Sequence, residues 1–337
     1  MDMEGEQAGY YFQIGSTYGI EGRWDLALQQ WEKALSLNPN IRGVKLLGQG
    51  NIALHQDDFG KAQNIFEEMN SRRNLIELHI AKGQIQKAIE LQKDAIKEAE
   101  MKSAKNQNMY NLYQFSAHLH EAADRPDLAL IEYQTAQSYF DKEASEAGRA
   151  NLWWYIDAKR RNLYGRAFAY LEMGRLEKAE ELLAEIENIS PDIVEKKTRI
   201  MRSYLKGRIA LEKNDTATAI LHLKNVLSWL GHEIHFGRTP HVIYVNSIAG
   251  AYMKAGNLEE AISTYEKIPL LTTGRLEWGH VYAKSFYNLG KLYQEKDWKG
   301  KAIENYEKFV TLWKDADPQF QPLIEDAKLQ LFKLETN

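Results

Sequence analysis

The sequence predicts an all-α fold made of stacked helix pairs. Three observations point to this class: a short amphipathic segment that recurs along the chain, prolines that stand only between or at the edges of apolar-periodic segments, and a second pattern of aromatic and small residues that precedes most copies of the first. Recurring segments of this kind are typical of helical hairpins, each too small to bury its own apolar face.

The recurring segment is clearest in GRWDLALQQWEKALSLNPN, residues 22–40. Each copy has a Gly or Asp turn, a polar first turn, an alanine, a large residue four positions later and an apolar residue three further on. This spacing places the alanine and both larger residues on one side of a helix. The copies are centred on Ala27, Ala88, Ala179, Ala261 and Ala302, with weaker copies at Ala62, Ala129 and Ala219.

The seven prolines mark where helices stop. A proline inside a helix removes a backbone hydrogen bond and clashes with the preceding turn, at a cost of about 3 kcal/mol. The intervals between the prolines are therefore predicted to be helical.

A partner helix precedes most copies. It carries an aromatic residue, an aliphatic residue beside a small one, and a second aromatic residue, all on one face. The small residue lets the next helix approach closely, and burying each aromatic side chain is worth roughly 2–3 kcal/mol. One pair cannot cover this surface, so pairs must stack. The clearest examples are Tyr11, Ile14, Gly15 and Tyr18 near the start and Phe286, Leu289, Gly290 and Tyr293 near the end.

These positions resemble the signature of tetratricopeptide repeats, and the resemblance covers nearly the whole chain. It implies an α–α superhelix, a single solenoid over residues 1–337. Eight helix pairs are expected at 8–41, 42–70, 71–102, 105–145, 148–191, 193–231, 240–273 and 277–316, followed by a capping helix at 319–335.

The spacing of the alanines is uneven. An interval of 26 residues predicts a short helix at 73–81, and an interval of 50 predicts an extended helix at 148–174. The last helix, with a polar face, would cap the stack. Residues 9–20 are apolar nearly all round, so we expect an upstream domain or a second copy of the chain to cover them. The C-terminal part also resembles the repeat arrays of large bacterial signalling proteins.

Composition excludes several classes. Apolar residues make up 44% of the chain. Charged residues make up 27%, and their signs nearly balance to a net charge of −4. This near balance argues against a nucleic-acid partner. With no cysteine, thiolate metal sites and cysteine nucleophiles are ruled out. The polar start is unlike a secretory signal, and no apolar run is long enough to span a membrane, so a cytoplasmic protein is predicted.

No catalytic motif emerges, so no enzyme, metal or cofactor is predicted. His232 and His235 are three residues apart, whereas a helical zinc-protease motif requires four, so residues 231–237 are interpreted as a polar loop. His118 and Glu121 share a helix face without a third ligand. Neither a phosphate-binding loop nor a nucleophile elbow is present.

The resemblance also suggests where a partner binds, because in this family the first helix of each pair lines a concave groove. An extended or helical protein segment with apolar and acidic side chains would suit such a groove. The alternative for several tyrosines is burial against the next repeat. The expected groove residues are Phe12, Gln114, His118, Tyr164, Phe168, Tyr204, Arg208, Asn246, Tyr287 and Lys291.

Two functions follow from this. The first is a non-enzymatic scaffold that binds a protein or peptide in the groove. The alternative is a sensory or regulatory segment of a larger bacterial signalling or transcription-regulating protein, in which the repeats control a missing effector domain.

Overall fold

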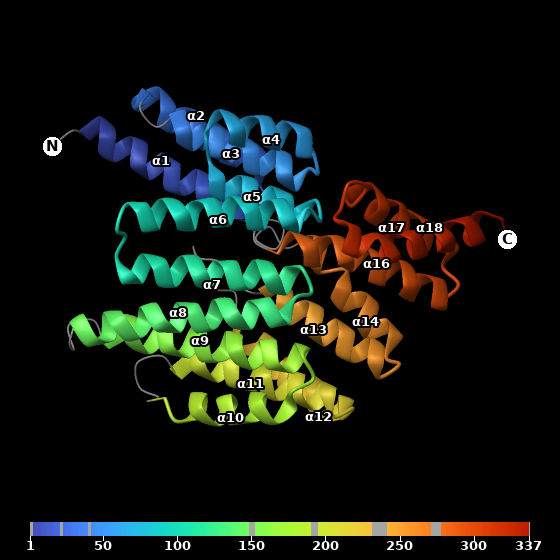
Figure 1. The fold of residues 1–337 in the computed structure, drawn as a ribbon. Coiled ribbons are helices and arrows are strands. Elements are labelled where there is room, and N and C mark those ends of the chain that lie inside the picture. Colours follow the sequence, from blue (N-terminus) through green and yellow to red (C-terminus); the bar gives the residue numbers. More distant parts are fainter. Residues whose placement is uncertain are drawn as a thin grey trace. The chain divides into compact units, whose positions relative to one another are not determined.

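The computed structural model describes residues 3–20, 23–39, 42–147, 152–189, 195–230, 241–270 and 278–336. Within these ranges all regular secondary structure is helical, as predicted, and no strand is present. The chain divides into two compact units. Unit 1 comprises residues 1–84, 234–243 and 265–337, and unit 2 comprises residues 85–233 and 244–264. Figure 1 labels the helices of both.

Unit 1 combines the two ends of the chain. Its N-terminal helices are α1 (Met3–Ile20), α2 (Trp24–Leu37), α3 (Arg42–His55), α4 (Phe59–Glu68) and α5 (Arg72–Ala81). Its C-terminal elements are the 3₁₀ turn η2 (Ile268–Leu270), α16 (Gly279–Glu295), α17 (Lys299–Leu312), the 3₁₀ turn η3 (Pro318–Phe320) and α18 (Gln321–Thr336).

Small residues let large ones enter between these helices, as the sequence predicted. Trp31 of α2 is 6% exposed and fits against two glycines. A Cβ atom on Gly15 of α1 would lie 2.6 Å from the indole, and one on Gly48 of α3 would lie 2.2 Å from it. In the last pair, a Cβ on Gly290 would lie 2.7 Å from Tyr306. Glycine is therefore required for the close helix packing at these positions.

The N-terminal and C-terminal helices of unit 1 pack directly together. Trp313, which is fully buried, donates from Nε1 to the carbonyl oxygen of Ala81 at 3.2 Å. A Cβ on Gly279 at the start of α16 would lie 2.5 Å from Ala81. The backbone N–H of Asp317 donates to the Gly83 carbonyl at 3.0 Å. Helix α5 thus lies against α16, far along the chain, as well as against its neighbour α4.

An acidic side chain adds a polar contact to this packing. Asp57 accepts a hydrogen bond from the Tyr282 hydroxyl at 3.1 Å and forms an ion pair with Lys308 Nζ at 2.6 Å. Asp57 stands in the turn after α3, where its φ of 59° directs the chain into α4. One residue therefore ends a helix and joins α3 to α16 and α17.

Unit 2 contains the consecutive helices from the middle of the chain. They are α6 (Ile85–Met101), α7 (Asn106–Ala122), α8 (Pro126–Ala147), α9 (Leu152–Glu172), α10 (Leu176–Glu187), α11 (Glu195–Glu212), α12 (Thr216–Leu230), α13 (His241–Lys254, from residue 244 on) and α14 (Leu258–Tyr265, up to residue 264).

The same turn follows the first helix of every pair whose turn is described. Its second residue has a positive φ, and the next residue donates a backbone hydrogen bond to the last turn of the helix, which satisfies a carbonyl that the helix leaves open. Glycine, Asp and Asn tolerate this conformation best. The positions are Asp57, Gly83, Asp124, Gly174, Asn214, Gly256 and Asp297.

The helices observed in the described ranges follow the order of those expected from the sequence, whereas their division into eight pairs stays a prediction. The short helix at 73–81 is α5, with 10 residues, and the extended helix at 148–174 is α9, with 21 residues. The helix predicted at 319–335 is α18, but its surface is less polar than expected, because Leu329 and Phe332 are 49% and 64% exposed. That all eight pairs form one continuous solenoid stays a prediction.

Candidate functional site

The first helices of unit 2 bring aromatic side chains together. Tyr204 of α11 lies between Tyr164 of α9, with ring centroids 6.1 Å apart, and Tyr244 of α13, at 4.8 Å. The Tyr204 hydroxyl shares a hydrogen bond of 2.8 Å with Ser247. Each tyrosine comes from a different helix pair, so the cluster connects three successive pairs.

Phe168 and Arg208 extend this cluster towards the ends of α9 and α11. The Phe168 ring lies nearly parallel to that of Tyr204, with centroids 6.4 Å apart, and the Arg208 guanidinium lies 4.9 Å from the centre of the Phe168 ring. Arg208 also donates to Glu172 of α9 and, at 3.4 Å, to the Tyr204 hydroxyl. Phe168 is half-buried, and 17% of the Arg208 side chain is exposed. We call Tyr164, Phe168, Tyr204, Arg208 and Tyr244 the aromatic–arginine face.

Two tyrosines of this face, Tyr164 and Tyr244, stay protonated at neutral pH. Burial raises the pKa of Tyr164 and of Tyr244 well above the ordinary value for a tyrosine. Their hydroxyls can therefore act as hydrogen-bond donors and bring no negative charge to the face.

Tyr204 is not exposed as the sequence suggested. We expected it to point into a groove, but its exposed fraction is 0%, because Tyr164, Phe168 and Tyr244 surround it. The alternative prediction, burial against the next repeat, is correct for this residue. Tyr204 supports the side chains around it and cannot itself contact a partner in this conformation.

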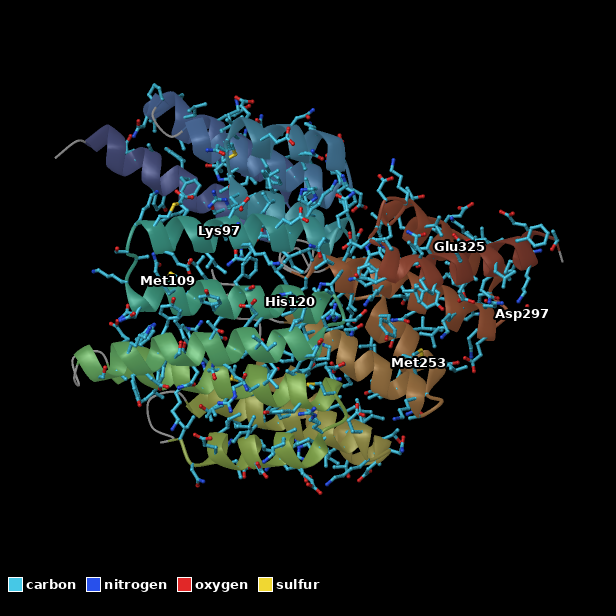
Figure 2. All side chains as sticks on the ribbon, viewed as in Figure 1. Lys97, Met109, His120, Met253, Asp297 and Glu325 are labelled. Atoms are coloured by element: carbon cyan, nitrogen blue, oxygen red, sulfur yellow. The ribbon has the colours of Figure 1, made fainter. Side chains whose placement is uncertain are left out.

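Helix α7 contributes a polar part of unit 2. His118 Nδ1 lies 3.4 Å from Glu121 Oε2, and the Tyr133 hydroxyl donates to Glu121 Oε1 at 2.9 Å. His118 is 8% exposed and Gln114 is half-buried. His120, which Figure 2 labels, lies 3.7 Å from Glu132. Both histidines are thus next to carboxylates and largely covered.

The remaining expected residues are distributed over both units. In unit 1, Phe12 packs against Ala27 and Trp31, Tyr287 donates to Asp326 at 2.6 Å, and the exposed Lys291 lies 5.6 Å from the centre of the Tyr287 ring. In unit 2, Asn246 is half-buried on α13. Helix α18 therefore covers part of the surface at Tyr287 that we expected a partner to use.

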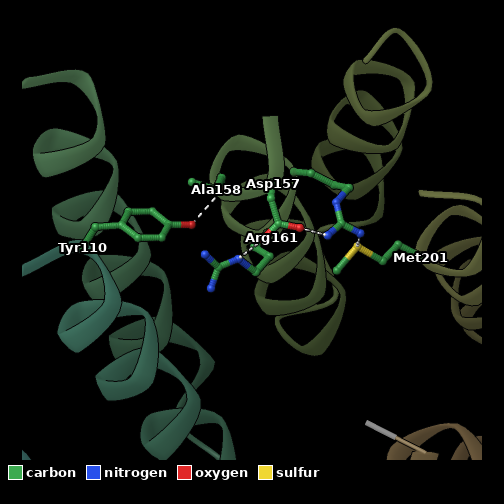
Figure 3. A network of polar contacts seen from close by, with 6 residues as sticks. Tyr110, Asp157, Ala158, Arg161 and Met201 are labelled. Carbon is green, nitrogen blue, oxygen red and sulfur yellow. Dashed lines mark hydrogen bonds and ion pairs between the residues drawn. The ribbon is translucent and has the colours of Figure 1, made fainter. Parts of the chain in front are cut away.

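A charged cluster on α9 was not anticipated. Asp157 pairs with both Arg160 and Arg161. Figure 3 shows this network and labels Asp157 and Arg161. Asp157 and Arg160 are 8% and 3% exposed. The sequence DAKRR carries a signal for this cluster, because an acid three and four residues before two arginines shares a helix face with them.

Several expectations concern metal chemistry. Among the residues that the structure describes, no three His, Asp or Glu side chains gather as a metal site would require. The loop at 231–237, with His232 and His235, lies outside the described residues.

No helix in the described ranges combines the length and apolar character needed to cross a bilayer.

Comparisons with known proteins bear on the repeats. The tetratricopeptide-repeat model matches residues 8–41 and 283–312, and the PPR-repeat model matches residues 244–270. No curated protein matches the chain.

Solved structures of low identity are also similar. The Cut9–Hcn1 hetero-tetramer of the APC/C has 16% identity and a TM-score of 0.46 over 93% of this chain and 54% of that one. This chain thus spans about half the length of that match. A tetratricopeptide-repeat protein from Parabacteroides merdae has 14% identity and a TM-score of 0.45 over 98% and 100% of the two chains. YrrB, a repeat protein with an unusual peptide-binding site, has 18% identity and a TM-score of 0.34 over 65% and 91%.

The repeat matches near both ends agree with the helix pairs and with the turn that follows the first helix of each pair. The chain therefore contains segments that match tetratricopeptide repeats, at residues 8–41 and 283–312.

Proposed function

We propose that this protein is a non-enzymatic scaffold that binds a polypeptide segment on the aromatic–arginine face of unit 2. The segments that match tetratricopeptide repeats support a role in protein interactions in general terms. The aromatic–arginine face, which draws on three successive helix pairs, supports this particular location.

The strongest support is the way neighbouring groups fix Phe168 and Arg208. The Tyr204 ring lies nearly parallel to the phenyl ring, and Glu172 and the Tyr204 hydroxyl both accept hydrogen bonds from the guanidinium that contacts this ring. Side chains already held in place lose little conformational entropy when a partner binds. Aromatic and Arg side chains are also the residues that most often dominate binding energies at protein interfaces.

The chemistry of the face indicates the kind of partner. Half-buried rings at Tyr164 and Phe168 favour contact with apolar side chains, and Arg208 favours an acidic one. A partner segment with apolar residues for the two rings and an acidic residue for Arg208 would match this face, in an extended or a helical form. Gln114, His118, Asn246, Phe12, Tyr287 and Lys291 stay predictions as contact residues.

The experiment compares two cationic side chains in the same region. Arg208 on the first-helix face and Lys213 in the turn after α11 each pair with a glutamate of the preceding helix pair, Glu172 and Glu180. We expect Arg208→Gln to weaken partner binding about tenfold or more, whereas Lys213→Gln leaves it unchanged. Binding is measured as the fraction of partner retained on the immobilised protein over a concentration series.

The outcomes separate the proposal from its rivals. Equal retention by both variants would contradict the location on the aromatic–arginine face. Loss of retention together with a lowered unfolding temperature for Arg208→Gln would assign the residue a structural role. The alternative function, a regulatory segment of a larger signalling protein, stays a prediction.

A further inference from the structure

The charged cluster on α9 contains more positive than negative charge. Asp157 Oδ2 lies 3.0 Å from Arg161 Nε, and its Oδ1 accepts a hydrogen bond from Arg160. One carboxylate therefore faces two guanidinium groups (Figure 3). Tyr110 does not offset the difference, because burial raises the pKa of its phenol, which donates to the Ala158 carbonyl at 2.6 Å.

Arg160 has too few acceptors for a buried cation. Its side chain is 3% exposed, and its Nε–H has no hydrogen-bond partner among the described residues. A further N–H group is directed at the sulfur of Met201, 3.0 Å away. A thioether is a weak acceptor, so this contact replaces little of the hydration that the guanidinium lost on burial. A buried arginine normally satisfies its donors with oxygen atoms.

The cluster has an accessible side. The Arg161 side chain is 37% exposed, and its guanidinium lies 5.5 Å from the centre of the Tyr110 ring. Met201 is half-buried, and its flexible side chain can move aside more easily than a packed aromatic ring. An oxygen anion that approaches from Arg161 would gain one exposed guanidinium and, once Met201 moves, the buried one.

The cluster also lies on the same first helix as the aromatic–arginine face. Arg160 and Tyr164 are four residues apart on α9, as are Tyr164 and Phe168, so the three share one helix face. An acidic side chain at the cluster would therefore be about two helical turns from an apolar side chain at Phe168.

We propose that Arg160 and Arg161 form a carboxylate-binding subsite that takes an Asp or Glu side chain of the bound polypeptide. This inference rests on the proposed function for the identity of the ligand, but its test uses the isolated protein and needs no partner. The bound carboxylate supplies the oxygen acceptors that Arg160 lacks and balances the charge of the cluster.

The test measures the unfolding temperature with a small probe that carries a single side-chain carboxylate. The probe is N-acetyl-glutamate N-methylamide at roughly 50 mM, and its glutamine counterpart at the same ionic strength is the neutral control. We expect the glutamate compound to raise the unfolding temperature by about 2 °C and the glutamine compound to leave it unchanged. Inorganic phosphate forms a third arm.

The variants then locate the effect. Arg160→Met leaves Asp157 paired with Arg161, so we expect an unfolding temperature equal to or above that of the wild type without probe, and no response to the glutamate compound. In the second variant, Arg161→Met, we expect the glutamate compound to raise the unfolding temperature by about half as much as in the wild type. Arg125→Met, on the exposed turn before α8, removes the same charge and should keep the full response.

Several results would overturn the proposal. They are a wild type that does not respond to the glutamate compound, a full response that survives in Arg160→Met or Arg161→Met, and a response lost in Arg125→Met. If phosphate raised the unfolding temperature and the glutamate compound did not, the subsite would bind a free anion and not an acidic side chain. The effect of Arg208→Gln on partner binding does not enter these outcomes. The subsite and the proposed function are therefore tested independently, and either can be refuted without the other.

Discussion

Replacing Trp313 with alanine should release α5 from the C-terminal helices of unit 1. Trp313 is fully buried and packs against Phe309 and Phe320, with ring centroids 5.2 and 4.8 Å away. Truncating a buried Trp costs about 3–5 kcal/mol, and the lost hydrogen bond to Ala81 adds about 1 kcal/mol. We therefore expect a loss of about 4 kcal/mol or more.

Helix α5 should register this loss most clearly. It has 10 residues, which is too short for stability in water without packing. Amide hydrogen exchange, followed by mass spectrometry of peptides from 72–81, reports how often this helix opens. A destabilisation of about 4 kcal/mol corresponds to an exchange rate about a thousandfold higher.

Trp298 provides the matched control. It stands at the start of α17 in the same helix pair, but it is 45% exposed. Trp298→Ala should change the exchange of 72–81 by less than tenfold. If Trp313→Ala left the exchange of these residues unchanged, the packing of α5 on the C-terminal helices would not stabilise α5, and this reasoning would be wrong.

Two further predictions concern unit 1. Gly48→Ala should lower the free energy of unfolding in urea by about 1–3 kcal/mol, because the added Cβ would overlap the Trp31 ring. The control Gly300→Ala places its Cβ in open space and should be neutral or stabilise the protein by up to about 1 kcal/mol. Equal effects of the two substitutions would contradict the packing argument. The hydrogen bond from Tyr287 lowers the pKa of Asp326 in the folded protein. The ionised Asp326 therefore stabilises the fold at any pH above the pKa that this residue has in the unfolded chain. This contribution is lost as the pH falls through the pKa of Asp326 in the folded protein. In Tyr287→Phe the pKa should return towards 3.8, which an NMR titration of the Asp326 carboxyl carbon would measure; an unchanged pKa would argue against the hydrogen bond.

The repeat architecture was predictable because its determinants are local. The alanine-centred segments, the small residues opposite large ones, and the Gly, Asp or Asn after each first helix follow from helix spacing and backbone conformation. Even the short α5 and the long α9 were visible as irregular spacing between alanines.

Contacts between distant segments were not predictable in this way. Nothing in the sequence around Asp57 or Ala81 indicates Tyr282, Lys308 or Trp313 as neighbours, since more than two hundred residues separate them. A repeat pattern identifies the face that each helix buries, but it does not identify which distant helix covers that face.

Exposure of individual site residues was equally hard to predict. Tyr164 and Tyr204 occupy equivalent positions in successive repeats, yet only Tyr204 is fully buried. The difference depends on Tyr244 and Ser247 in the following pair, which lie against Tyr204. The charge excess at Arg160 likewise depends on what α7 and α11 bring to the cluster.

Site-specific photo-cross-linking tests the central claim most directly. The photoreactive residue p-benzoylphenylalanine replaces Phe168 on the aromatic–arginine face in one variant and Leu221, 59% exposed on the second helix α12, in another. If unit 2 binds a polypeptide on its first-helix face, position 168 forms a cross-link to the partner and position 221 does not. Cross-linking from position 221 alone, or equally from both positions, would contradict the account.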